Sequence, residues 1–80
     1  MATRWHRLRI SAERYQILSG TGLVEVGAKL RETVGPEDTV LIPPGYRQRI
    51  TCTGEEDLVF LAICSPPFQP NDYEDAELAG

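Results

Sequence analysis

Few residues of this chain have side chains suited to chemistry, and three of them stand out by type. His6 is the sole histidine, Glu13 is a carboxylate within an apolar pattern, and Gln48 is an amide in a similar pattern. A neutral imidazole and a carboxylate suit a single divalent transition metal such as zinc, iron, copper or manganese, with an amide as a weak third ligand. The same imidazole and carboxylate also suit acid–base work. We therefore expect either a metal site of His6, Glu13 and Gln48 or a hydrogen-bonded polar cluster of these residues.

Alternating segments must position these groups. Residues 4–10, 13–19 and 46–52 alternate with period two, which is typical of β-strands with one buried face. If the apolar members of each segment point inward, several polar side chains point inward with them. This reasoning predicts an apolar ligand pocket that carries five polar groups: His6, Glu13, Tyr15, Gln48 and Cys52. In the first segment His6 shares its face with Leu8 and Ile10.

The remaining segments predict an all-β domain. Short apolar or alternating runs at 23–26, 29–34 and 39–42 are separated by turns rich in glycine and proline. Residues 57–64 form the most apolar run, which we interpret as a buried strand. Seven or so short strands favour a barrel or a sandwich. The two cysteines, Cys52 and Cys64, lack a zinc-type spacing and are interpreted as two reduced thiols or one disulfide.

Two stretches resemble the signature motifs of the cupin superfamily. Glu13 and Gly20, with six residues between them, fit the second half of the first motif, and His6 occupies its first histidine position. Pro43 and Gly45 fit the Pro-x-Gly of the second motif. The resemblance runs from about residue 5 to residue 68 and is closest to a small single-domain, mannose-6-phosphate-isomerase-like subgroup.

The same alignment of motifs shows departures at positions that usually bind metal. Leu8 stands where the second histidine is expected, Gln48 where the last histidine is expected, and Cys52 where the asparagine is expected. Glu37 replaces a glycine that opens the second motif, so we expect a strained backbone there.

The resemblance implies a minimal cupin-like β-barrel of the jelly-roll type over residues 4–68, lacking some N-terminal strands, and an acidic tail at 69–80. It implies a small-molecule ligand in the barrel beside a degenerate metal site. The alternatives are a metal-dependent enzyme, either sugar-phosphate isomerase-like or dioxygenase-like, and an interaction module.

The net charge of −4 hides an asymmetry that bears on partners. Residues 1–50 hold all eight basic side chains and five acidic ones, whereas residues 51–80 hold seven acidic side chains and no basic ones. An acidic total argues against nucleic acid, and no apolar run is long enough to span a membrane. We expect a cytoplasmic homodimer that covers exposed strand edges.

The outward faces next to Trp5 carry four arginines that could bind an anion, a partner or the acidic tail: Arg7, Arg9, Arg47 and Arg49.

Overall fold

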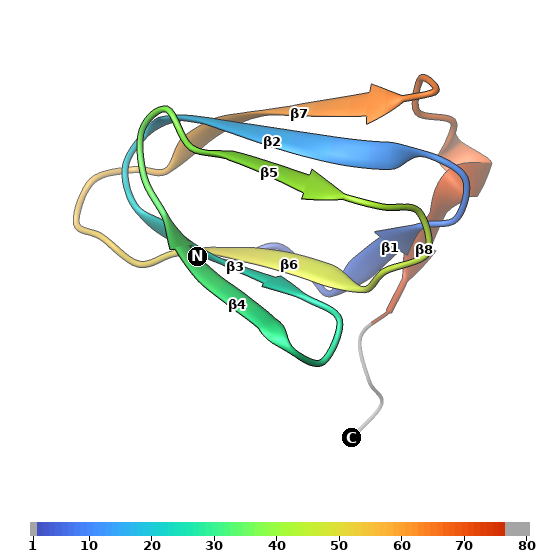
Figure 1. Cartoon of the computed structure of the whole chain (residues 1–80), viewed down its shortest axis with the longest axis horizontal. Helices are drawn as coiled ribbons and strands as arrows, with labels where there is room; N and C mark the ends of the chain where they lie inside the picture. The colour runs from blue at the N-terminus through green and yellow to red at the C-terminus, as the bar shows by residue number, and fades with distance from the viewer. Residues whose placement is uncertain (1, 77–80) are drawn as a thin grey trace.

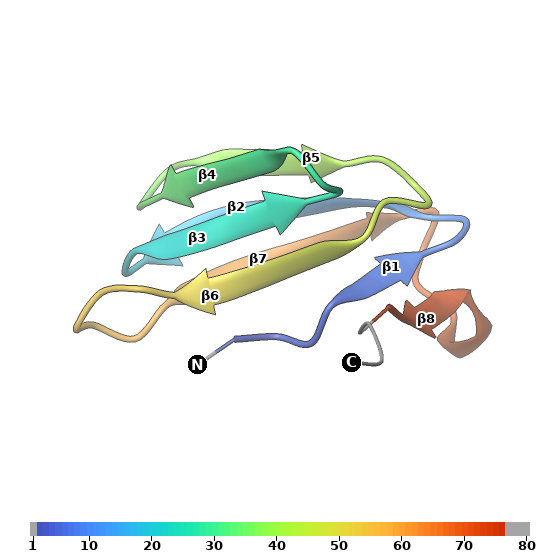
Figure 2. The same cartoon turned by 90° about the horizontal axis from the view of Figure 1, so that it is seen from below.

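The chain folds into two antiparallel sheets that lie face to face (Figure 1, Figure 2). The computed structural model describes residues 2–76. The larger sheet has the order β4-β3-β6-β1-β8, and the smaller has the order β5-β2-β7. The strands are β1 (His6–Leu8), β2 (Ala12–Ser19), β3 (Gly22–Val26), β4 (Leu30–Val34), β5 (Thr39–Ile42), β6 (Gln48–Cys52), β7 (Val59–Ser65) and β8 (Tyr73–Asp75). The expected all-β, cupin-like jelly-roll class is confirmed, but the two sheets are not closed into a barrel.

Alternation along the strands builds the core between the sheets. On β2, Glu13, Tyr15 and Ile17 are buried while Arg14 and Leu18 are exposed, as the period-two pattern predicts. The core cluster joins both sheets and consists of Tyr15, Ile17, Val24, Val34, Ile42 and Ile50. Each fully buried aliphatic side chain contributes about 1.5–3 kcal/mol. Apolar packing therefore holds the sheets together, and the polar side chains among it must find partners.

One predicted strand ends early. Ile10 was expected to point inward with His6 and Leu8, but it is 59% exposed. β1 stops at Leu8 because the chain then bends, and the Ile10 N–H donates to Oδ1 of Asp72 at 2.5 Å instead of to a neighbouring strand. Asp72, which is 1% exposed, also accepts from the Ser11 N–H at 3.1 Å. This carboxylate ties the β1–β2 connection to the C-terminal segment.

The most apolar run is not a buried strand, which corrects the expectation for residues 57–64. β7 pairs only with β2, so it forms one edge of the smaller sheet. Five of its seven residues are exposed. Hydrophobicity alone cannot distinguish a central strand from an edge strand, because that depends on which segment lies on the other side.

Two turns show why the motif positions hold the residues they do. Gly20 has φ +83°, and a Cβ there would lie 2.8 Å from the Leu58 Cα and closer still to the Asp57 carbonyl oxygen. Only glycine fits this left-handed position beside the neighbouring backbone. Glu37 has φ +75°, which confirms that a non-glycine residue stands in a left-handed turn position.

The acidic C-terminal segment returns to the basic N-terminal strand. After the 3-10 helix η1 (Pro70–Asp72), β8 pairs with β1 at the edge of the larger sheet. Arg7 pairs with Glu74, and Arg4 lies 3.0 Å from Asp75. Basic residues near the N-terminus and acidic residues near the C-terminus thus form ion pairs within one chain. Residues 77–80 of the predicted tail lie outside the described residues. None of the helical segments within residues 2–76 has the length and hydrophobicity needed to cross a membrane.

Candidate functional site

A hydrogen bond between the two sheets forms the centre of the candidate site. Tyr15 on β2 and Gln48 on β6 are almost completely buried, and the Tyr15 hydroxyl donates to Gln48 Oε1 at 2.5 Å. Burial raises the pKa of Tyr15 well above its ordinary value, and the negative charge of Glu13 adds to this. Tyr15 therefore stays a neutral donor at any physiological pH.

His6 lies directly opposite Gln48, because β1 and β6 pair with these two residues in register. His6 Nδ1 is 2.8 Å from the Arg4 carbonyl oxygen, and the ring stacks on Tyr73 with centroids 5.5 Å apart. A carbonyl oxygen can only accept, so Nδ1 carries the proton and Nε2 is the nitrogen left to accept in the neutral ring. The strand pairing and the ring stacking together fix the orientation of the imidazole.

Glu13 carries the unsatisfied group of the site. Its Oε2 lies 3.9 Å from Cys64 Sγ, whereas its Oε1 is buried and has no hydrogen-bond partner in the described part of the chain. Burial raises the pKa of Glu13, an effect opposed mainly by the charge of His6 and then by Gln48, Tyr15 and Cys64. A buried acceptor without a donor costs about 1–3 kcal/mol, so such a group calls for a bound donor.

We call His6, Glu13, Tyr15 and Gln48 the polar cluster. All four side chains are buried. Ala62 and Cys64 on β7 pair with Tyr15 and Glu13 and therefore face the same way as these two residues. Ala62 is exposed and Cys64 is half-buried. The inner face of the sheet is thus partly uncovered along β7, whereas the unsatisfied Oε1 of Glu13 is itself buried.

The fifth predicted pocket residue lies apart from the cluster. Cys52 is at the far end of β6 from Gln48, roughly 13 Å away at the usual rise of a strand. Its Sγ lies 3.4 Å from the Glu56 carbonyl oxygen. It lines a different cavity of about 610 Å³, whose lining also includes Glu55, Glu56 and Asp57 of the loop before β7. Both Cys52 and Cys64 are free thiols.

The four surface arginines already have partners within the chain. Arg7 donates to Glu74 at 2.6 Å, Arg9 to the Asn71 carbonyl at 2.7 Å, and Arg47 to the Ala76 carbonyl at 3.1 Å. Arg49 pairs with Glu25 at 2.7 Å. The guanidinium groups of Arg47 and Arg49 also lie 4.1 and 4.6 Å from the centre of the Trp5 ring. Carboxylates balance the charges of Arg7 and Arg49, whereas the neutral carbonyl partners of Arg9 and Arg47 do not balance theirs.

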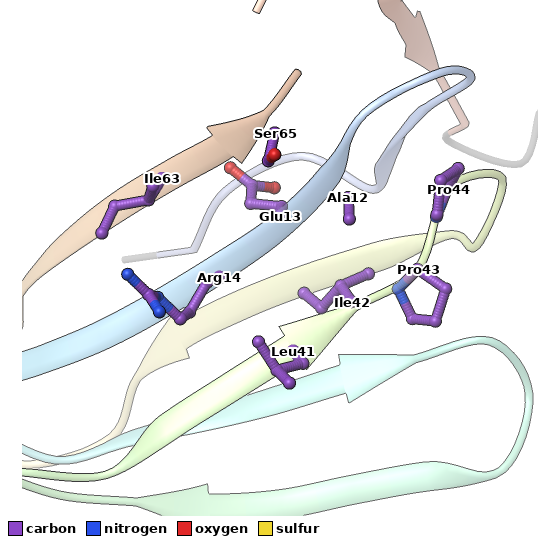
Figure 3. Close-up of a pocket in the computed structure, with 9 residues that line it drawn as sticks. All are labelled: Ala12, Glu13, Arg14, Leu41, Ile42, Pro43, Pro44, Ile63 and Ser65. Atoms are coloured by element: carbon purple, nitrogen blue, oxygen red, sulfur yellow. The ribbon is translucent and has the colours of Figure 1, made fainter. Parts of the chain in front are cut away.

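A cavity on the outer face of the smaller sheet did not follow from the sequence reasoning. It has a volume of about 560 Å³ at the β5 end (Figure 3). Leu41, Arg14 and Ile63 face outward in one row across β5, β2 and β7. The signal was the apolar character of the outward positions on β5 and β7; for residues 57–64 this character was interpreted as a buried strand.

The fold and the two motifs can now be compared with known families. The family model described as "Cupin domain" matches residues 2–64. The chain belongs to the cupin family. No curated protein matches it in a sequence comparison. The match includes the whole polar cluster and stops before η1 and β8, the segments that cover β1 of this cupin.

Cupin domains often bind metals, so the residues of this cupin must be tested as ligands. His6 and Glu13 supply two donors, but the third candidate, Gln48 Oε1, already accepts the Tyr15 hydroxyl. Burial and the charges of Glu13 and Asp72 raise the pKa of the Cys64 thiol, which disfavours a thiolate ligand. Within residues 2–76 no group of three or more His, Cys, Asp or Glu side chains is placed to hold a metal ion. The side chains present do not fit a transition-metal centre.

Proposed function

We propose that this cupin binds a small hydroxylated organic molecule at the polar cluster, without a resident metal. The observation that carries the proposal is the buried Glu13 Oε1 that lacks a donor. A ligand hydroxyl would supply that donor and remove the cost of the unsatisfied acceptor. His6 Nε2 and the carboxylate are acceptors and the Gln48 amide is a donor. Hydroxyl groups, which both donate and accept, match such a mixture better than a simple anion does.

The alternatives from the sequence receive less support from the residues. A metal-dependent isomerase or dioxygenase needs at least three ligands, and the polar cluster offers two unengaged ones. A partner of an interaction module acting through the arginine surface would compete with the hydrogen bonds that all four guanidinium groups make within the chain. We therefore propose ligand binding and assign no specific reaction.

The test is a thermal-shift and calorimetric screen with neutral monosaccharides, polyols and their phosphate esters. A ligand present at about 100 times its dissociation constant stabilises a one-site protein by about 2.7 kcal/mol. We expect at least one neutral probe to raise the melting temperature of the wild type and of Cys52→Ser, whose change is remote from the cluster. The same probe should not stabilise Glu13→Gln. An equal response in Glu13→Gln, or no response of the wild type to any probe, would overturn the proposal.

A measurement of bound metal is the second test of the proposed function. Tag-free protein is dialysed against zinc, iron(II), copper or manganese and then against buffer, and bound metal is measured by mass spectrometry. We expect no stoichiometric metal to remain. About one metal per chain that is lost in His6→Ala would favour the metal-dependent alternative instead.

A further inference from the structure

Within residues 2–76, β7 is a free sheet edge that lacks most of the usual protection. It spans Val59–Ser65, pairs with β2 on one side only, and contains no charged residue and no proline. Proteins normally protect an exposed edge with charges, prolines, bulges or a short strand, because its unpaired N–H and C=O groups are a template for another strand. The register shift beside Ile17 and Ser19 affects only the start of β7. The rest of this edge is regular and apolar.

The other three edges are protected. β4 carries Arg31 and Glu32, and β8 has three residues, two of which are Glu74 and Asp75. β5 has four residues and runs directly into Pro43, which has no N–H to donate. The contrast makes β7 the edge where another strand would pair most readily.

The strand is complementary to a reversed copy of itself. If two β7 strands pair antiparallel along their whole length, residue 59 faces 65, 60 faces 64, 61 faces 63, and Ala62 faces the other Ala62. On the outer face Leu61 then lies opposite Ile63 twice, and on the inner face Phe60 lies opposite Cys64 twice. Apolar pairs of this kind stabilise an antiparallel sheet, and no like charges oppose each other. The symmetry is that of an isologous dimer, in which one patch meets its own copy.

We propose that two copies of this chain associate through their β7 edges and form one continuous six-stranded sheet, β5-β2-β7 with β7-β2-β5 of the second copy. The occupant of the edge is thus a second copy. Phe60 of the second copy would lie opposite Cys64, whose Sγ is 3.9 Å from Glu13 Oε2. The pairing would therefore place an aromatic side chain of the partner beside the residue that neighbours Glu13.

The size of the contact sets the expected strength. Seven paired residues extend for roughly 24 Å at the rise of an antiparallel strand. A sheet edge of that length is much smaller than the roughly 800 Å² per partner of a stable complex. We expect a reversible dimer with a dissociation constant between about 1 μM and 1 mM.

Sedimentation velocity over a concentration series, without added ligand, tests the pairing. Ala62→Lys places two like charges face to face at the symmetry axis, on an exposed position. Leu41→Lys is the matched control, because Leu41 is 73% exposed on the same sheet but lies on β5. We expect the wild type and Leu41→Lys to dimerise and Ala62→Lys to stay monomeric, with unchanged circular dichroism in all three. A wild type that is monomeric at about 1 mM, or an Ala62→Lys variant that dimerises like the wild type, would overturn the proposal.

If Ala62→Lys does not fold, disulfide cross-linking can test the pairing instead. In a background with Cys52→Ser and Cys64→Ser, Ala62→Cys should form an intermolecular disulfide on mild oxidation, because paired Cα atoms on adjacent strands are within disulfide range. Leu41→Cys in the same background should not. A dimer that persists while Ala62→Cys fails to cross-link would place the interface elsewhere and refute β7 pairing. Since no ligand is present, the result is independent of the proposed binding function.

Discussion

Removal of the Tyr15 hydroxyl tests whether the polar cluster is bonded as described. In Tyr15→Phe the ring remains, so its edge-to-face contact with Phe60 at 5.0 Å is retained. The hydroxyl that donates to Gln48 Oε1 is lost. Because Gln48 is 1% exposed, water cannot easily replace that donor. A buried acceptor left without a partner costs about 1–3 kcal/mol, which is a large part of the stability of a domain this small.

We expect Tyr15→Phe to lower the free energy of unfolding by about 2 kcal/mol, or the melting temperature by about 8–16 °C. Urea titration followed by the fluorescence of Trp5, the sole tryptophan, measures it. Tyr46→Phe is the matched control, because Tyr46 is 52% exposed. A double-mutant cycle with Gln48→Met should give a coupling energy of about 1 kcal/mol or more, since that variant removes the stranded acceptor as well. A Tyr15→Phe variant within about 0.5 kcal/mol of the wild type, or no more affected than Tyr46→Phe, would refute the reasoning.

Three further changes test other parts of the structure. Burial holds the pKa of Glu13 above its ordinary value of 4.5, so the folded state binds the extra proton and the stability due to Glu13 is lost as pH rises through the folded pKa. Glu13→Gln should therefore gain stability relative to the wild type as pH increases from 4 to 8 in thermal melts, and a constant difference would contradict this. Gly20→Ala should cost at least about 2 kcal/mol in urea titrations, because the added Cβ meets backbone at a left-handed position; a neutral result would contradict the turn geometry. Glu37→Gly should stabilise by about 0.5–1 kcal/mol by relieving the strain at φ +75°, and a loss of stability would contradict that account.

The sequence predicted the fold class because its signals were local. Alternation placed Glu13, Tyr15 and Ile17 on one face of β2, and the structure buries these residues. The glycine positions of the motifs mark turns with positive φ, and the substitution at Glu37 was recognisable for the same reason. Such features depend on a few neighbouring residues, so they can be inferred without knowledge of the whole fold.

Features that depend on distant segments could not be predicted in the same way. The early end of β1 depends on Asp72, more than sixty residues away, accepting the Ile10 N–H. The exposure of β7 depends on the lack of a strand beside it in the described chain. In the candidate site, the polar residues were recognisable by type, but the partner of each group was not. That Gln48 bonds Tyr15 while Glu13 Oε1 remains unsatisfied is a property of how two sheets meet.

The pairing of β1 with β8 has a consequence for how the protein is made. A ribosome releases residues 6–8 long before residues 73–75, so β1 must wait for nearly the whole chain to emerge before its outer edge is paired. Contacts between segments so far apart along the chain also form late in folding, since closing a long loop costs entropy before the contact repays it. We therefore expect a nascent chain of which residues up to 72 have emerged to keep the backbone amides of β1 that face β8 open to hydrogen exchange. In such a chain β7 is already complete, and its unprotected edge would be available to a neighbouring nascent chain on the same message.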